Sequence, residues 1–98
     1  MAKLTAKQVE SGLRDLPEWT STGESIQRTV RFADFVAAME FVKRIAEEAE
    51  REQHHPDILI RYDKVTLTLS THDAGGMTGK DLRFAGLVDG LIAGQSQA

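Results

Sequence analysis

The chain has 98 residues, of which 41% are hydrophobic and 28% charged, so we expect one globular domain over residues 1–98. Its formal net charge of -3 argues against a protein that binds nucleic acid with its whole surface. The absence of cysteine excludes a disulfide framework, a thiolate metal site and a cysteine nucleophile, and it fits a cytoplasmic location. The first ten residues lack the apolar run of a signal peptide, and no segment approaches the length of a membrane span.

The first predicted element is a short helix over about residues 6–16. Thr5 and Gln8 have the spacing of a capping box at its start, and Pro17 ends the helical pattern. The apolar residues that share one face of this helix are Val9, Leu13 and Leu16.

Two strands follow, at residues 19–21 and 26–32, joined across a turn of residues 22–24. Arg28 interrupts the alternation of polar and apolar residues in the second strand. The apolar residues that share a face there are Ile26, Val30 and Phe32.

The longest predicted helix covers residues 35–53, with Asp34 as its N-cap. Pro56 disfavours helical geometry in the residue before it, so this helix should end near His54. An apolar stripe at steps of three and four residues consists of Phe35, Met39, Val42, Ala46 and Ala49, widened by Phe41 and Ile45. We interpret the charged side as a solvated surface, where the pairs spaced for weak ion pairs are Glu40 with Arg44 and Glu47 with Arg51.

Two further strands are predicted at residues 58–62 and 65–71. Only residues 63–64 separate them, which is short enough for a two-residue hairpin turn. Alternate residues of the second strand point to opposite faces, so His72 should end a polar row. The apolar row is Val65, Leu67 and Leu69, and the polar row is Thr66, Thr68, Ser70 and His72.

The last predicted element is a helix that begins at a second capping-box pattern, Thr78 with Asp81, and stops near Gly94. Its apolar stripe is Phe84, Leu87, Val88, Leu91 and Ile92. The order of elements is therefore α-β-β-α-β-β-α. Two hairpins separated by a helix predict an α+β domain, with one four-stranded antiparallel sheet and helices packed on one of its faces.

All three histidines lie in the stretch between Glu50 and Asp81. His54 and His55 stand where the long helix stops, and His72 follows a strand, so the predicted connections bring them to one layer. Histidine is the side chain whose unperturbed pKa lies closest to neutrality, so such a cluster suits proton transfer. A single histidine at a helix or strand end is often structural, and the convergence of all three favours catalysis.

Two carboxylates could serve the same site. Asp81 either only caps its helix or also fixes the tautomer of a neighbouring imidazole. Glu50 lies one helical turn before His54 and either holds that imidazole or is simply exposed. Three histidines and an acid can ligate zinc, but their spacing matches no compact metal signature, so we expect no metal. The chain has no phosphate loop, nucleophile elbow or dinucleotide-binding glycine pattern.

The chain carries, in this order, the motifs Glu50-x-x-x-His54-His55-Pro56, Tyr62, Thr71-His72 and Asp81. Together they resemble the pterin-4a-carbinolamine dehydratase family. The resemblance covers nearly the whole chain, and its other parts are Trp19 after a short helix, Phe32-x-Asp34-Phe35 and the hairpin Tyr62-Asp63-Lys64-Val65.

The resemblance implies an α+β domain that forms homodimers or homotetramers through helix and sheet-edge contacts. It implies a reaction that removes water from a 4a-hydroxytetrahydropterin and gives the quinonoid dihydropterin. This reaction recycles the cofactor of aromatic amino-acid hydroxylases, one of which is then an expected partner. The pterin is the substrate, so the resemblance implies no separate cofactor and no metal.

The family's histidines correspond to His54, His55 and His72, and its acid corresponds to Asp81. On this basis we expect His54 and His72 to exchange protons with the substrate, His55 to anchor the pterin or share that task, and Asp81 to orient an imidazole. Some members carry a tryptophan two residues after the proline, where this chain has Ile58, so no aromatic side chain can stack on the substrate from there. The expected substrate-binding residues are Glu50, Ser70, Thr71 and His55.

Two other functions fit parts of the sequence. Some relatives in this family are dimerisation partners of a transcription factor, and the wide apolar stripe on residues 35–53 could serve a partner helix as well as the core. An intact set of histidines favours retained catalysis over a pure binding module. A zinc hydrolase is the third interpretation, and full activity after chelation would exclude it.

Overall fold

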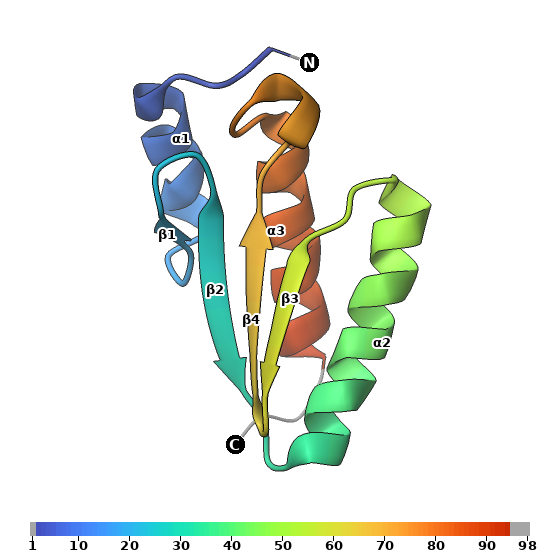
Figure 1. Ribbon diagram of the computed structural model, residues 1–98. Helices are drawn as coiled ribbons and strands as arrows, with labels where there is room; N and C mark the ends of the chain where they lie inside the picture. The colour runs from blue at the N-terminus through green and yellow to red at the C-terminus, as the bar shows by residue number, and fades with distance from the viewer. Residues whose placement is uncertain (1, 95–98) are drawn as a thin grey trace.

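The computed structural model describes residues 2–94 as three α-helices and two short 3-10 helices around a four-stranded antiparallel sheet. The strand order is β1-β2-β4-β3, and the helices cover one face of the sheet, so the predicted α+β fold is confirmed (Figure 1). No helix within residues 2–94 has the length and apolar character needed to cross a bilayer. The elements are α1 (Ala6–Gly12), η1 (Leu13–Asp15), β1 (Thr20–Ser21), β2 (Ile26–Arg31), α2 (Phe35–Glu52), β3 (Asp57–Arg61), β4 (Lys64–Leu69), η2 (His72–Ala74) and α3 (Gly79–Ala93).

The sheet presents an apolar face to the helices and leaves a polar face open. In β4, Val65, Leu67 and Leu69 are completely buried, as the alternation predicts. On the opposite face the hydroxyl of Thr66 lies 2.7 Å from that of Thr29 in β2, a cross-strand pair that ties the two central strands. The helix-facing side of β4 therefore forms the middle of the core.

Arg28 interrupts the pattern of β2 because it takes part in a polar bridge between the sheet and α3. It pairs in register with Leu67 and so lies on the helix-facing side. Its Nη1 atom donates to Oδ1 of Asp89 at 2.7 Å, and the same oxygen accepts the indole N–H of Trp19 at 2.8 Å. The carboxylate satisfies two groups that would otherwise be desolvated without partners.

Helix α2 begins as expected, with the Asp34 carboxylate accepting the backbone N–H of Ala37 at 2.8 Å. Its buried face matches the expected stripe only in part and consists of Ala38, which was not expected, and of Phe41, Ile45 and Ala49, which were. Phe35, Val36 and Met39 are 46%, 67% and 38% exposed. The apolar arc of this helix is wider than the strip that the sheet can cover, so periodicity alone does not decide which of its edges faces inward.

The hairpin turn between β3 and β4 lies one residue earlier than expected. Arg61 pairs with Lys64, so the two turn residues are Tyr62 and Asp63. Tyr62 adopts a φ of 54°, in the left-handed region that two-residue hairpin turns require. The carbonyl of Asp63 accepts the backbone N–H of Phe32 at 2.8 Å, which joins this turn to the end of β2.

Two segment ends also differ from expectation. The first helix is α-helical only to Gly12 and continues as η1. Strand β4 ends at Leu69, so His72 does not end a row on the strand but begins η2.

The ion pairs on α2 are only partly those expected. Arg51 donates to Glu48 at 2.6 Å rather than to Glu47. Within residues 2–94 no ion pair joins Glu40 and Arg44. Both spacings are common on helix surfaces and differ little in energy, so sequence spacing does not choose between them.

Candidate active site

Asp81 lies at the centre of a buried hydrogen-bond network. It occupies the third position of α3, where its Oδ2 atom accepts the backbone N–H of Thr78 at 2.9 Å, and its side chain is completely shielded from solvent. The capping box predicted at this helix start is therefore confirmed. The second oxygen of the carboxylate is left to accept a hydrogen bond from elsewhere.

That second oxygen faces His54. Helix α2 ends because Gln53 takes a left-handed conformation with a φ of 52°, and the chain then turns the His54 ring inward. Its Nε2 atom lies 2.6 Å from Oδ1 of Asp81, and its ring meets Phe84 nearly edge-on, at 6.1 Å between centroids. A carboxylate only accepts, so Nε2 carries the proton and Nδ1 is left as the free ring nitrogen of the neutral imidazole.

Two threonine hydroxyls complete the network. Thr71, which follows β4, donates from Oγ1 to Oδ2 of Asp81 at 2.7 Å. The same hydroxyl lies 2.7 Å from Oγ1 of Thr78, which must then be the donor because a hydroxyl has a single proton. The network thus joins the end of α2, the segment after β4 and the start of α3. Thr78 was expected only as a helix cap, and its place beside Asp81 in the capping box was the signal for this second role.

His55 is oriented by a different acid. Its Nε2 atom lies 2.6 Å from Oε2 of Glu50, and both side chains are mostly exposed. Of the two alternatives weighed for Glu50, the structure shows it bonded to an imidazole, but to that of His55 rather than His54. The histidine pair therefore points in two directions, one ring inward and the other to the surface.

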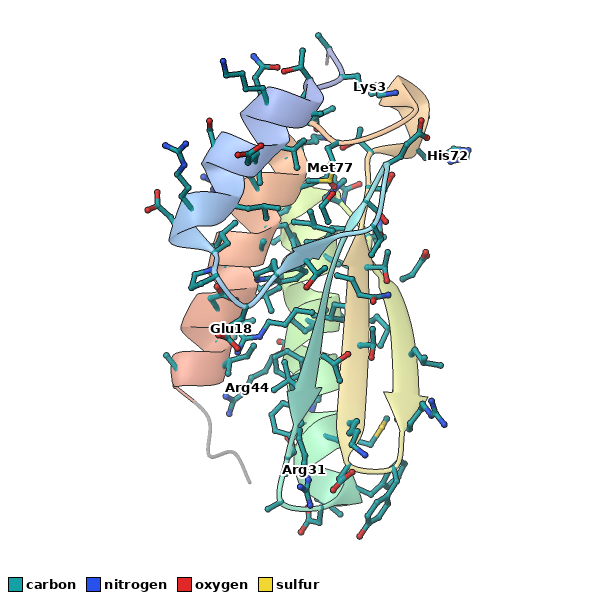
Figure 2. All side chains as sticks on the ribbon, turned by 90° about the vertical axis from the view of Figure 1, so that its left-hand side faces the viewer. Lys3, Glu18, Arg31, Arg44, His72 and Met77 are labelled. Carbon is teal, nitrogen blue, oxygen red and sulfur yellow. The ribbon has the colours of Figure 1, made fainter. Side chains whose placement is uncertain are left out.

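His72 carries an exposed imidazole at the start of η2. Within residues 2–94 no group hydrogen-bonds this ring, and Figure 2 shows it pointing outward from the end of the molecule. It is joined to the buried network only through its chain neighbour Thr71. Ser70 is half-buried and takes no part in the network.

An ion pair ties the end of α2 to α3 beside this network. Arg83 donates from Nε to Oε1 of Glu52 at 2.9 Å. This hydrogen bond lowers the pKa of Glu52 below its usual value and raises the pKa of the Arg83 guanidinium. The Glu52–Arg83 ion pair and the His54–Asp81 contact both hold the carboxyl end of α2 against α3.

The arrangement suits proton transfer at the end of the sheet where α2 and β4 finish (Figure 1). One imidazole is fixed in position and tautomer, and two others are accessible to solvent. Among residues 2–94, no three histidine, aspartate or glutamate side chains are grouped so as to hold a metal ion. The chemistry open to these residues themselves is acid–base.

Comparison with known proteins identifies the family. A family model described as pterin 4 alpha carbinolamine dehydratase matches residues 2–91. The chain belongs to this family. A relative from Acidobacterium capsulatum is 51% identical over 92 residues, covering 94% of this chain and all of the relative. One from Nocardia farcinica is 52% identical over 88 residues, covering 90% and 93%. Both are named, provisionally, as pterin-4-alpha-carbinolamine dehydratases.

Solved structures of this dehydratase family and its fold agree with the architecture. A crystal structure described as a transcriptional coactivator/pterin dehydratase from Brucella melitensis has a TM-score of 0.85 and 33% identity, covering 91% of this chain and 97% of its own. A pterin dehydratase-like protein identified as a RuBisCO assembly factor in the α-carboxysome has a TM-score of 0.67 and 24% identity, covering 81% and 93%. The similarity to this second structure, at 24% identity, shows a shared fold and nothing further.

Proposed function

We propose that this chain is a dehydratase that converts a 4a-hydroxytetrahydropterin to the quinonoid dihydropterin and water, and so recycles the cofactor of aromatic amino-acid hydroxylases in the cytoplasm. Membership of the dehydratase family supports the substrate class. The observation that carries the proposal is the buried contact between His54 and Asp81, together with the exposed imidazoles of His55 and His72. A dehydration needs one group that gives a proton and another that accepts one, and this set can supply both.

The elimination breaks the bond between C4a and the hydroxyl oxygen. One imidazolium delivers a proton to the leaving oxygen, and a neutral imidazole removes a proton from the ring nitrogen, so that water leaves. We assign these transfers to His72 and His54, of which His54 acts through Nδ1 because Nε2 is engaged with Asp81. His55, held by Glu50, anchors the pterin or shares the transfer. Ser70 and Thr71 complete the proposed contacts with the substrate.

We propose further that copies of this chain associate. Strand β3 lies at the edge of the sheet, and within residues 2–94 it pairs only with β4, so its outer edge has backbone groups without strand partners there. Its residues Ile58, Leu59 and Ile60 are 36%, 54% and 37% exposed. The exposed apolar residues of α2 add to this surface, which a second copy could cover by extending the sheet and packing helix against helix.

A binding role for the same surface is the second candidate. The exposed apolar residues at the start of α2 would suit a partner helix, and the Brucella melitensis neighbour is described as a coactivator as well as a dehydratase. Pull-down with the intact chain, set beside the dehydration assay, separates the two functions. Activity without a captured partner supports the enzyme, and a captured partner without activity supports the binding module.

The direct test of the proposed function is a dehydration assay with a 4a-hydroxytetrahydropterin generated by a hydroxylase, in the presence and absence of chelator. We expect turnover that chelation leaves unchanged. Loss of turnover on chelation, with metal found by elemental analysis, would instead support a zinc enzyme. An assay rate no faster than the uncatalysed dehydration would overturn the proposal.

A further inference from the structure

We propose that the N-terminal residues Lys3 and Leu4 form a brace that positions His72, and that they are therefore positioning residues for the dehydration. The inference rests on the proposed function for its catalytic meaning. The juxtaposition itself is independent of that function, because the brace touches the loop that carries His72 and not the histidine ring.

The position of the His72 ring depends on the backbone of its loop, since no group within residues 2–94 bonds the ring. The loop is closed by hydrogen bonds from Thr71 N to Gly76 O at 2.9 Å and from Gly75 N to His72 O at 3.0 Å. Gly75 has a φ of 73°, a conformation that glycine adopts without strain. These contacts hold the loop on the side of Thr71, and its returning leg, residues 76–77, has a second anchor on the other side.

The brace supplies that anchor through the main chain. The backbone N–H of Leu4 donates to the carbonyl of Met77 at 2.7 Å. The Met77 side chain is buried, and Leu4 packs against the core. The returning leg of the loop therefore lies between Thr71 on one side and Leu4 on the other.

Lys3 adds a second anchor through its side chain. Its stem covers Gly76 so closely that a Cβ atom on Gly76 would lie 2.8 Å from Cε of Lys3. Its Nζ atom donates to Oε1 of Glu24, in the turn between β1 and β2, at 3.2 Å. In Figure 2, Lys3 lies against this loop while His72 points away from it, so the brace supports the loop without obstructing the ring.

A hollow of about 590 Å³ lies beside the brace and is lined by Leu4, Val9 and Met77 among others. The brace borders open space there rather than a close-packed core. Loss of the main-chain bond or of the lysine stem should consequently move the loop, and a displacement of about 1 Å at a catalytic group can lower a rate by about 100-fold.

Leu4→Pro tests the main-chain anchor, because proline has no N–H to give to Met77. The matched control is Leu4→Ala, which keeps the N–H and loses only side-chain packing. Thr5 and its capping box remain intact in both. We expect Leu4→Pro to lower kcat by about 10-fold or more with KM within about 2-fold, and Leu4→Ala to keep kcat within about 2-fold. Equal kcat in the two variants would overturn the brace.

Gly76→Ala and Lys3→Ala test the side-chain anchor as a double-mutant cycle. The methyl group should displace the lysine stem in the parent chain, and that stem is absent in the Lys3→Ala background, so the two effects on kcat should not add. Lys3→Met keeps the stem without the charge and should retain kcat. Additive effects would show that Lys3 does not cover Gly76 and would overturn this anchor.

Hydrogen exchange of the Gly75 and Gly76 amides, together with the NMR signals of the His72 ring, gives a readout that needs no enzyme activity. Faster exchange and a shifted His72 ring in Leu4→Pro, but not in Leu4→Ala, would support the brace even if the chain proved inactive. If the parent chain is active and neither readout moves in Leu4→Pro, the brace is wrong and the proposed function stands.

Discussion

The Nε2 atom of His54 lies 2.6 Å from Oδ1 of Asp81, and the two side chains are only 9% and 0% exposed. The same carboxylate caps α3 through Thr78 and accepts a hydroxyl from Thr71. A residue that closes a helix thus also fixes an imidazole that comes from 27 residues earlier in the chain. Structural and proposed catalytic roles coincide in one side chain, which has a measurable consequence.

Asp81→Asn should separate the two roles. The amide is nearly isosteric and can still cap α3, but its N–H₂ group can turn the His54 ring to the wrong tautomer. We expect turnover to fall by about 10²–10⁴-fold while the fold is retained. Asp81→Ala should in addition destabilise the fold by about 3 kcal/mol, because three donors, two of them buried, lose their acceptor. Steady-state rates and urea unfolding measure both effects, with the exposed Asp73→Asn as control.

Loss of either exposed histidine should lower turnover without lowering stability. His55→Ala and His72→Ala are each expected to lower turnover by about 10²–10⁴-fold, because each removes a group that exchanges protons with the substrate or anchors it. Their free energies of unfolding should stay within about 0.5 kcal/mol of the parent, since both rings are exposed. His54→Ala should lower both turnover and stability. Unchanged turnover in both exposed variants would contradict the acid–base mechanism.

The fold could be predicted from the sequence where local signals agree. The two capping boxes, the stop before Pro56 and the alternation in β4 each depend on neighbouring residues, and the structure confirms all of them. The buried face of α2 could not be predicted, because its apolar arc includes both the core side and the exposed Phe35 and Met39. The width of the sheet determines which part of this arc is buried.

The site could be predicted only in part for a similar reason. The sequence indicated carboxylates as candidate partners of the imidazoles, but not that Asp81 contacts His54 while Glu50 contacts His55. Which carboxylate each histidine contacts depends on the direction of its ring after the helix ends. The left-handed conformation of Gln53 sets that direction. The hydroxyl of Thr78 was missed because the capping pattern already accounted for that residue.

The ion pair between Glu52 and Arg83 should make stability depend on acid pH. The hydrogen bond from Arg83 lowers the pKa of Glu52 in the folded chain below its ordinary value of 4.5. The pair therefore stabilises the fold above that value and loses its contribution as pH falls through the lowered pKa. Glu52→Gln should be less stable than the parent at neutral pH and should approach it at acid pH. Urea unfolding of both chains at several pH values checks this.

High salt provides the control for that experiment. Arg83 is largely exposed, so added salt should screen the pair and reduce the difference between Glu52→Gln and the parent at neutral pH. A difference that persists unchanged at acid pH would mean that Glu52 acts through packing and not through its charge.

The exposed apolar surface of β3 and α2 should mediate association between copies of the chain. Leu59→Lys places a charge on the edge strand, and Met39→Lys places one on the exposed side of α2, so each should weaken a different contact. Sedimentation velocity over a range of concentrations should show the parent as a dimer or tetramer and the double variant as a monomer.

The matched control for association is Thr20→Lys, which adds the same charge to an exposed position on β1, at the opposite edge of the sheet from β3. It should leave the assembly unchanged. If Met39→Lys alone converts a tetramer to a dimer, the two surfaces act in sequence, because strand pairing at β3 survives the loss of helix packing. A parent chain that sediments as a monomer at all concentrations would contradict association through either surface.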